Sequence, residues 1–106
     1  DASGVLSIDG ELLPMEFALH QNYPNPFNPT TTLRYDLPQD SHVLITIYDT
    51  RGRKVKTLIN ENQNAGYRIT QWNATNDFGQ PISAGMYIYA IQAGDFRTVK
   101  KMILLK

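Results

Sequence analysis

The chain of 106 residues contains no cysteine, and it has only two histidines and one tryptophan. The lack of cysteine excludes a disulfide framework, a thiolate metal site and a thiol nucleophile, so packing must supply the stability. Ten basic and ten acidic residues cancel, whereas binding to nucleic acid or to an anionic membrane needs a concentrated basic surface. No apolar run approaches the roughly 20 residues that cross a bilayer. We therefore expect no nucleic-acid partner and no membrane insertion.

Catalytic and metal-binding patterns are also scarce. His20 and His42 lie beside expected element boundaries, and no serine or carboxylate spacing suggests a catalytic triad with them. The stretch NATNDFG, residues 73–79, places oxygen-bearing side chains at alternate positions. An EF-hand calcium loop requires glycine at its sixth position and glutamate at its twelfth, where this chain has Phe78 and Ala84. We interpret the stretch as a turn, and we expect no catalytic residues, no metal and no cofactor.

The stretch QNYPNPFNPTTTLRYDLP, residues 21–38, concentrates proline and asparagine around two aromatic rings and then changes into a strand pattern. Proline fixes its own φ at about −65° and biases the residue before it away from helix. We therefore expect a stiff, extended entry segment. Tyr23 and Phe27 offer apolar anchors, and Asn25 and Asn28 can bond neighbouring backbone amides. Phe27 is expected to pack along the domain while both asparagines hold local amides.

From residue 30 onward, apolar and polar residues alternate with the period of strands that are buried on one face. The inward positions of the first two strands are Leu33, Tyr35, Leu37, Val43, Ile45 and Ile47. In DTRG, residues 49–52, aspartate opens and glycine closes a four-residue turn, which predicts a hairpin. Further strands are expected at 66–72, 85–93 and 96–105, the last two joined by a tight connection.

Regularly spaced strands, frequent turn signals and no convincing helix predict an all-β fold. It is expected to be an antiparallel immunoglobulin-like or fibronectin III-like β-sandwich of about seven strands. Trp72 is expected between the sheets, with an exposed, ligand-binding tryptophan as the alternative. Tyr87 and Tyr89 share a face with Ile91, so their rings are expected inside and their hydroxyls at the rim. A sugar-stacking row of tyrosines is the alternative.

Residues 1–16 have no sustained period, so we interpret them as a linker or the tail of a preceding domain. A short strand fits residues 5–8 within them. The remaining residues, 17–106, are expected to form one domain.

Four blocks of sequence carry a resemblance to a known family. They are FALHQNYPNPFNPTTTLRYDLP, VLITIYDTRGRKV, AGYRITQWNATNDFGQPISAGMYIYAIQAG and FRTVKKMILLK. In this order, over residues 17–106, they resemble the type A C-terminal sorting domain of the type IX (Por) secretion system. The immunoglobulin-like architecture is also similar to a domain of the flagellar hook-capping protein. Ala74 departs from the family pattern, which usually has glycine there, and Thr70 stands where a larger apolar residue is common.

The resemblance implies a non-catalytic domain that the type IX outer-membrane translocon recognises. It implies an N-terminally attached cargo that transits the periplasm to the cell surface or the medium, and a sortase-like cell-surface protease as a further partner. We expect a monomer. The residues expected to carry recognition lie in the entry motif and toward the end of the chain. They are Asn25, Pro26, Phe27, Asn28, Pro29, Gly85, Tyr87, Lys100, Lys101 and Lys106.

Other interpretations of these features stay open at this point. The NPFNP segment can instead clamp the first strand against the sandwich, and lysines on a terminal strand can simply protect an exposed edge from pairing. The whole domain can instead be a structural spacer or adhesion module, or a carbohydrate-binding accessory module, of a secreted multidomain protein. The chain ends one residue after its last strand-like run, which favours the terminal position that a sorting domain requires.

Overall fold

The computed structural model of the protein describes residues 4–6 and 12–105. Within these residues the chain forms β-strands and no helix, so no described segment is a helix able to span a membrane. The strands are β1 (Gly4–Leu6), β2 (Leu12–Pro14), β3 (Ala18–Leu19), β4 (Thr31–Leu37), β5 (Ser41–Tyr48), β6 (Lys54–Gln63), β7 (Gly66–Trp72), β8 (Gly85–Ala93) and β9 (Phe96–Leu104).

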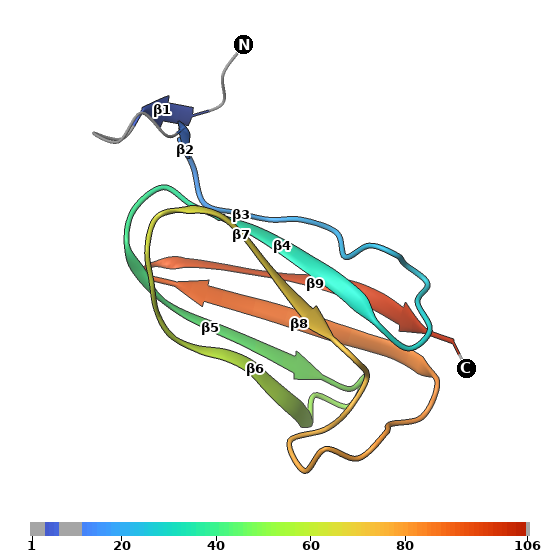
Figure 1. The fold of residues 1–106 in the computed structure, drawn as a ribbon. Coiled ribbons are helices and arrows are strands. Elements are labelled where there is room, and N and C mark those ends of the chain that lie inside the picture. The colour runs from blue at the N-terminus through green and yellow to red at the C-terminus, as the bar shows by residue number, and fades with distance from the viewer. Residues whose placement is uncertain (1–3, 7–11, 106) are drawn as a thin grey trace.

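Seven of these strands build two antiparallel sheets. One has the order β3-β4-β7 and the other the order β6-β5-β8-β9, and Figure 1 shows the two sheets layered on each other. This arrangement confirms the predicted immunoglobulin-like sandwich of seven strands. β1 and β2 form a separate hairpin beyond one end of the sandwich (Figure 1), and β2 contacts β4 and β7. The strand expected at residues 5–8 overlaps β1, although residues 7 and 8 lie outside the described residues.

The core lies between the sheets because alternate side chains of each strand point inward. All six inward positions predicted for β4 and β5 are at most 1% exposed. Trp72 is 1% exposed, which excludes the exposed-tryptophan alternative. Its indole nitrogen donates a 2.9 Å hydrogen bond to the Thr75 carbonyl oxygen, and its ring meets that of Tyr87 edge-on, with 5.9 Å between the centroids. The single tryptophan is therefore a central part of the core.

The polar turns form as their sequences predict. The Asp49 carboxylate accepts hydrogen bonds from the backbone amides of Arg51 and Arg53, each at 2.9 Å, and the bond from the Arg53 amide contributes most to lowering the pKa of Asp49. In the NATNDFG loop, the Asn76 side chain accepts from two amides of its own loop. The Asp77 carboxylate accepts from the Thr57 amide at 3.0 Å. These side-chain oxygens accept hydrogen bonds from backbone amides, which supports the turn interpretation over the calcium-loop alternative.

Candidate functional site

Residues 21–29, here called the strap, precede β4 and are anchored in the core by one ring. Phe27 is only 2% exposed and belongs to the buried cluster between the sheets. Its ring lies 5.9 Å from that of Trp72, centroid to centroid, at an interplanar angle of 52°. The Trp72 ring in turn contacts Tyr87. The expectation that Phe27 packs along the sandwich is therefore confirmed.

The strap pairs with the outer edge of β9. The Phe27 amide donates to the Ile103 carbonyl at 3.0 Å, and the Leu105 amide donates to the Phe27 carbonyl at 2.8 Å. These bonds form a parallel bridge between Phe27 and Leu104. The Asn25 side-chain oxygen accepts from the Ile103 amide at 2.9 Å, and the Gln21 side chain donates to the Lys101 carbonyl at 2.7 Å. The strap thus satisfies the backbone groups of an edge that would otherwise face solvent.

Asn22 organises the start of the strap and was not singled out by the sequence. It is 3% exposed, and its side-chain nitrogen donates to the Thr31 hydroxyl at 2.9 Å and to the Pro24 carbonyl at 3.2 Å. Its backbone amide donates to the Tyr89 hydroxyl at 2.8 Å, and that hydroxyl donates to the His20 carbonyl at 2.8 Å. Burial raises the pKa of Tyr89 to about 12. Through these two hydrogen bonds, the Tyr89 hydroxyl of β8 anchors the start of the strap to the larger sheet.

Two expectations about the strap were wrong. It is not extended throughout, because the chain bends at residues 24–26 and 28–29, and Tyr23 pairs antiparallel with Thr32. The peptide bonds that precede Pro24, Pro26 and Pro29 are cis. The asparagines do not hold local amides either. Asn25 bonds to β9, and Asn28 is exposed with no hydrogen bond in the described part of the chain. Asn22 makes the local contacts instead.

The candidate residues of β8 and β9 lie near the contact between the strap and β9, and they differ in burial. Gly85 begins β8 opposite Leu104, so the end of β9 lies between the strap and the start of β8. Lys101 is exposed, whereas Lys100 is half-buried on the inward-facing row and pairs with Tyr89 across the strands. Lys106 lies outside the described residues. The structure therefore brings the entry motif and the end of β9, which are separate in the sequence, to one edge of the larger sheet.

The tyrosines of β8 lie too deep to stack on sugars. Tyr87 is 7% and Tyr89 0% exposed. The Tyr87 hydroxyl donates to the Ser83 carbonyl at 2.6 Å. The sequence predicts that the tyrosine hydroxyls lie at the rim, but the Tyr89 hydroxyl is bonded to the Asn22 amide and the His20 carbonyl beneath the strap. Among the described residues the exposed rings belong to Tyr23, Tyr67 and Phe78, which lie on the strap, on β7 and in the loop after β7. They form no aromatic strip, so a sugar-stacking row of tyrosines is excluded.

The outer side of the strap is what a partner can reach. Pro24, Pro26, Asn28 and Pro29 are all exposed, and a surface depression of about 630 Å³ lies against the first half of the strap. The residues that line the depression are Gln21, Asn22, Tyr23, Asn25, Thr32 and Arg34. These groups offer hydrogen bonds and a fixed shape, and the arrangement suits recognition by surface contact.

The fold and this edge define a small immunoglobulin-like module whose first and last motifs join into one displayed surface. The family described as "Secretion system C-terminal sorting domain" matches residues 21–105. The chain belongs to this family.

Solved structures from other bacterial proteins share the fold. The dimeric latent PorU of Porphyromonas gingivalis aligns with a TM-score of 0.64 and 23% identity, over 89% of this chain and 10% of that chain. PorZ, a surface component of the type IX secretion system of the same organism, aligns with a TM-score of 0.56 and 19% identity, over 85% and 11% of the two chains. FlgD of P. aeruginosa aligns with a TM-score of 0.56 and 20% identity, over 74% and 67%. The chain thus spans about a tenth of PorU and of PorZ. No curated protein matches its sequence significantly.

Proposed function

We propose that this domain is a sorting module that directs an attached cargo through the type IX outer-membrane translocon to the cell surface or the medium. Membership of the sorting-domain family supports the proposal. The observation that carries it is the pairing of the strap with β9 through Phe27, Asn25 and Gln21. This pairing turns two separate sequence blocks into a single surface that a receptor can read as a shape.

Within this surface, the residues that bond or pack the strap onto the domain position it, and the other exposed residues contact the translocon. Phe27 and Asn25 fix the strap to the core and to β9, so their role is positioning. Pro26, Asn28 and Pro29 are exposed on the strap and supply the contacts, together with Lys101 on β9. A preorganised surface binds with little loss of conformational entropy, which explains why a transport signal is carried by a folded domain.

The domain itself acts without catalysis. It functions as a monomer, with its cargo on the N-terminal side, in transit through the periplasm, and a sortase-like cell-surface protease is a further partner. Gly85 and Tyr87 maintain the start of β8 beside the recognition edge, because Gly85 pairs with Leu104 and the Tyr87 ring contacts Trp72.

The proposal is tested by fusing the full chain behind a Sec-exported reporter in a bacterium that has a type IX system. The reporter is expected outside the cell with the wild-type domain and in the periplasm with a Lys100→Gln, Lys101→Gln variant. Circular dichroism and thermal melting must show that the variant is folded, so that loss of recognition is separated from loss of structure. A folded, intact wild-type fusion that stays periplasmic in several such hosts would contradict the proposal and favour a structural spacer.

A further inference from the structure

The outer face of the larger sheet is apolar and cationic, and it extends from the hairpin between β8 and β9 to Lys101 and Ile103, whose backbone groups contact the strap. Strands β5, β8 and β9 contain no aspartate or glutamate. On β9 the outward residues alternate between cations and apolar side chains, in the order Arg97, Val99, Lys101 and Ile103. Val99 is 61% and Ile103 39% exposed. In the described part of the chain, neither Arg97 nor Lys101 has an ion-pair partner.

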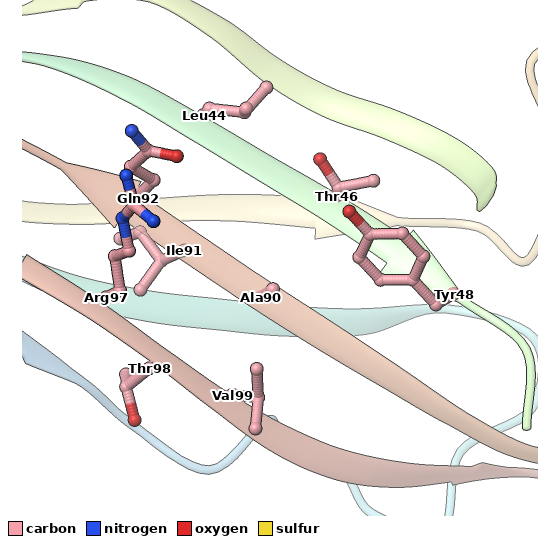
Figure 2. Close-up of a pocket in the computed structure, with 9 residues that line it drawn as sticks. All are labelled: Leu44, Thr46, Tyr48, Ala90, Ile91, Gln92, Arg97, Thr98 and Val99. Atoms are coloured by element: carbon pink, nitrogen blue, oxygen red, sulfur yellow. The ribbon is translucent and has the colours of Figure 1, made fainter. Parts of the chain in front are cut away.

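A trough crosses this face because its central row is built from short side chains. The cross-strand register aligns Thr46, Ala90 and Val99 in that row. The row on one side holds Leu44, Gln92 and Arg97, and the row on the other holds Tyr48, Ile88 and Lys101. Figure 2 shows the small Ala90 in the middle, with Gln92 and Arg97 toward one end and the Tyr48 ring toward the other. The hollow has a volume of about 420 Å³.

The spacing of the charges sets the pattern of a matching partner. Arg97 and Lys101 are four residues apart on one strand, which corresponds to roughly 13 Å, and Val99 lies midway. An extended segment that runs along β9 places its residues i, i+2 and i+4 on one face with the same spacing. A carboxylate at i and at i+4 would meet the two cations, while an apolar side chain at i+2 would enter the trough.

We propose that this face binds an extended polypeptide segment with an acidic residue, an apolar residue and an acidic residue at alternate positions. Charge complementarity favours this occupant over a second copy of the chain, because two copies of this face would bring cations together with no carboxylate between them. It also favours a polypeptide over a membrane, which typically attracts a cluster of four to eight basic residues. Lys101 is common to this face and to the proposed sorting surface, whereas Arg97, Val99 and Ala90 belong to this face alone, so an effect of Arg97→Glu or Ala90→Phe on peptide binding is independent of the sorting role.

The test uses a phage-displayed library of random 12-residue peptides, selected on the full chain. The enriched peptides are expected to share the acidic, apolar, acidic pattern at alternate positions. Synthetic versions should bind the Arg97→Glu, Lys101→Glu variant roughly tenfold more weakly or worse, because attraction becomes repulsion at two exposed pairs. Ala90→Phe, which fills the trough, should weaken binding similarly. The matched control is Arg34→Glu, Arg51→Glu, which changes the net charge equally on other surfaces and should leave the affinity unchanged.

Several outcomes would overturn the proposal. These are a library that yields no binders, enriched peptides without paired acids, and affinities that fall equally in the control and the charge-reversal variants. Circular dichroism of each variant separates a lost surface from a lost fold. A dimer in sedimentation that only the charge reversal disrupts would assign the face to a second copy. Binding to vesicles of equal phosphatidylcholine and phosphatidylglycerol, abolished by the same reversal, would assign it to a membrane.

Discussion

Replacing Phe27 by alanine tests whether the strap is held by its single buried ring. Phe27 is 2% exposed and contacts the Trp72 ring, and truncating a phenylalanine in such a position typically costs about 3–5 kcal/mol. The strap is also held by hydrogen bonds through Asn25, Gln21 and Asn22. We expect the loss to appear mainly as local opening of the strap, with the two sheets intact, because local units open before the whole domain does.

Hydrogen exchange measured by NMR resolves this opening at single amides. The amides of Ile103 and Leu105 donate to the strap, whereas the amides of Met102 and Leu104 point toward β8, because successive residues of a strand alternate in direction. Phe27→Ala should speed exchange at residues 103 and 105 by roughly 100-fold or more, as a cost of about 3 kcal/mol implies. Residues 102 and 104 should change far less.

The matched control is Phe78→Ala, because Phe78 is 86% exposed and its truncation should leave all four rates unchanged. Equal acceleration at residues 102 to 105 would mean that the strap and β9 unfold together. No acceleration at residues 103 and 105 would refute the reasoning, since it would show that the hydrogen bonds hold the strap without the ring.

Further predictions concern the core, the tyrosine beneath the strap and metal dependence. Trp72→Ala should lower the free energy of unfolding by about 3–5 kcal/mol, and an unchanged urea midpoint would show that its burial is unimportant. Burial raises the pKa of Tyr89 to about 12 from an unfolded value of about 10. Its stabilising contribution is therefore complete below pH 10 and is lost as the pH rises toward 12. Tyr89→Phe should reduce this alkaline loss in pH-dependent melting, although it costs about 1–3 kcal/mol at neutral pH by leaving the Asn22 amide and the His20 carbonyl unpaired. A metal chelator should leave the melting temperature unchanged, and a fall of several degrees would reveal a bound ion.

The strands were predictable because their signal is local. Period-two alternation alone predicts that Leu33, Tyr35 and Val43 face inward, and all three are at most 1% exposed. Turn chemistry was equally local, since Asp49 and Gly52 close the hairpin through a 3.0 Å backbone hydrogen bond. The departure at Ala74 also has a local structural counterpart. Its φ of 62° lies in the left-handed region, which favours glycine, the residue that is usual in the family.

The organisation of the site was not predictable in the same way, because it depends on contacts between distant parts of the chain. Asn25 and Ile103 are 78 residues apart, and no periodicity links the strap to β9. The burial of Asn22 is not predictable, since an asparagine among several others gives no sign of burial. Asn25 and Asn28 look equivalent in the sequence, yet only Asn25 bonds to β9. Asn25 has a hydrogen-bond partner because its side chain lies beside the edge of β9.

The central claim is that the exposed side of the strap is read by the translocon, and that the strap is more than a clamp. The most direct measurement is the fraction of a fused reporter found outside the cell for an Asn28→Ala, Lys101→Gln variant of the full chain. Both side chains are exposed, so the variant should keep slow hydrogen exchange at residues 103 and 105. The account predicts that such a folded variant leaves most of the reporter in the periplasm. Export equal to that of the wild type, with the strap still protected, would contradict it.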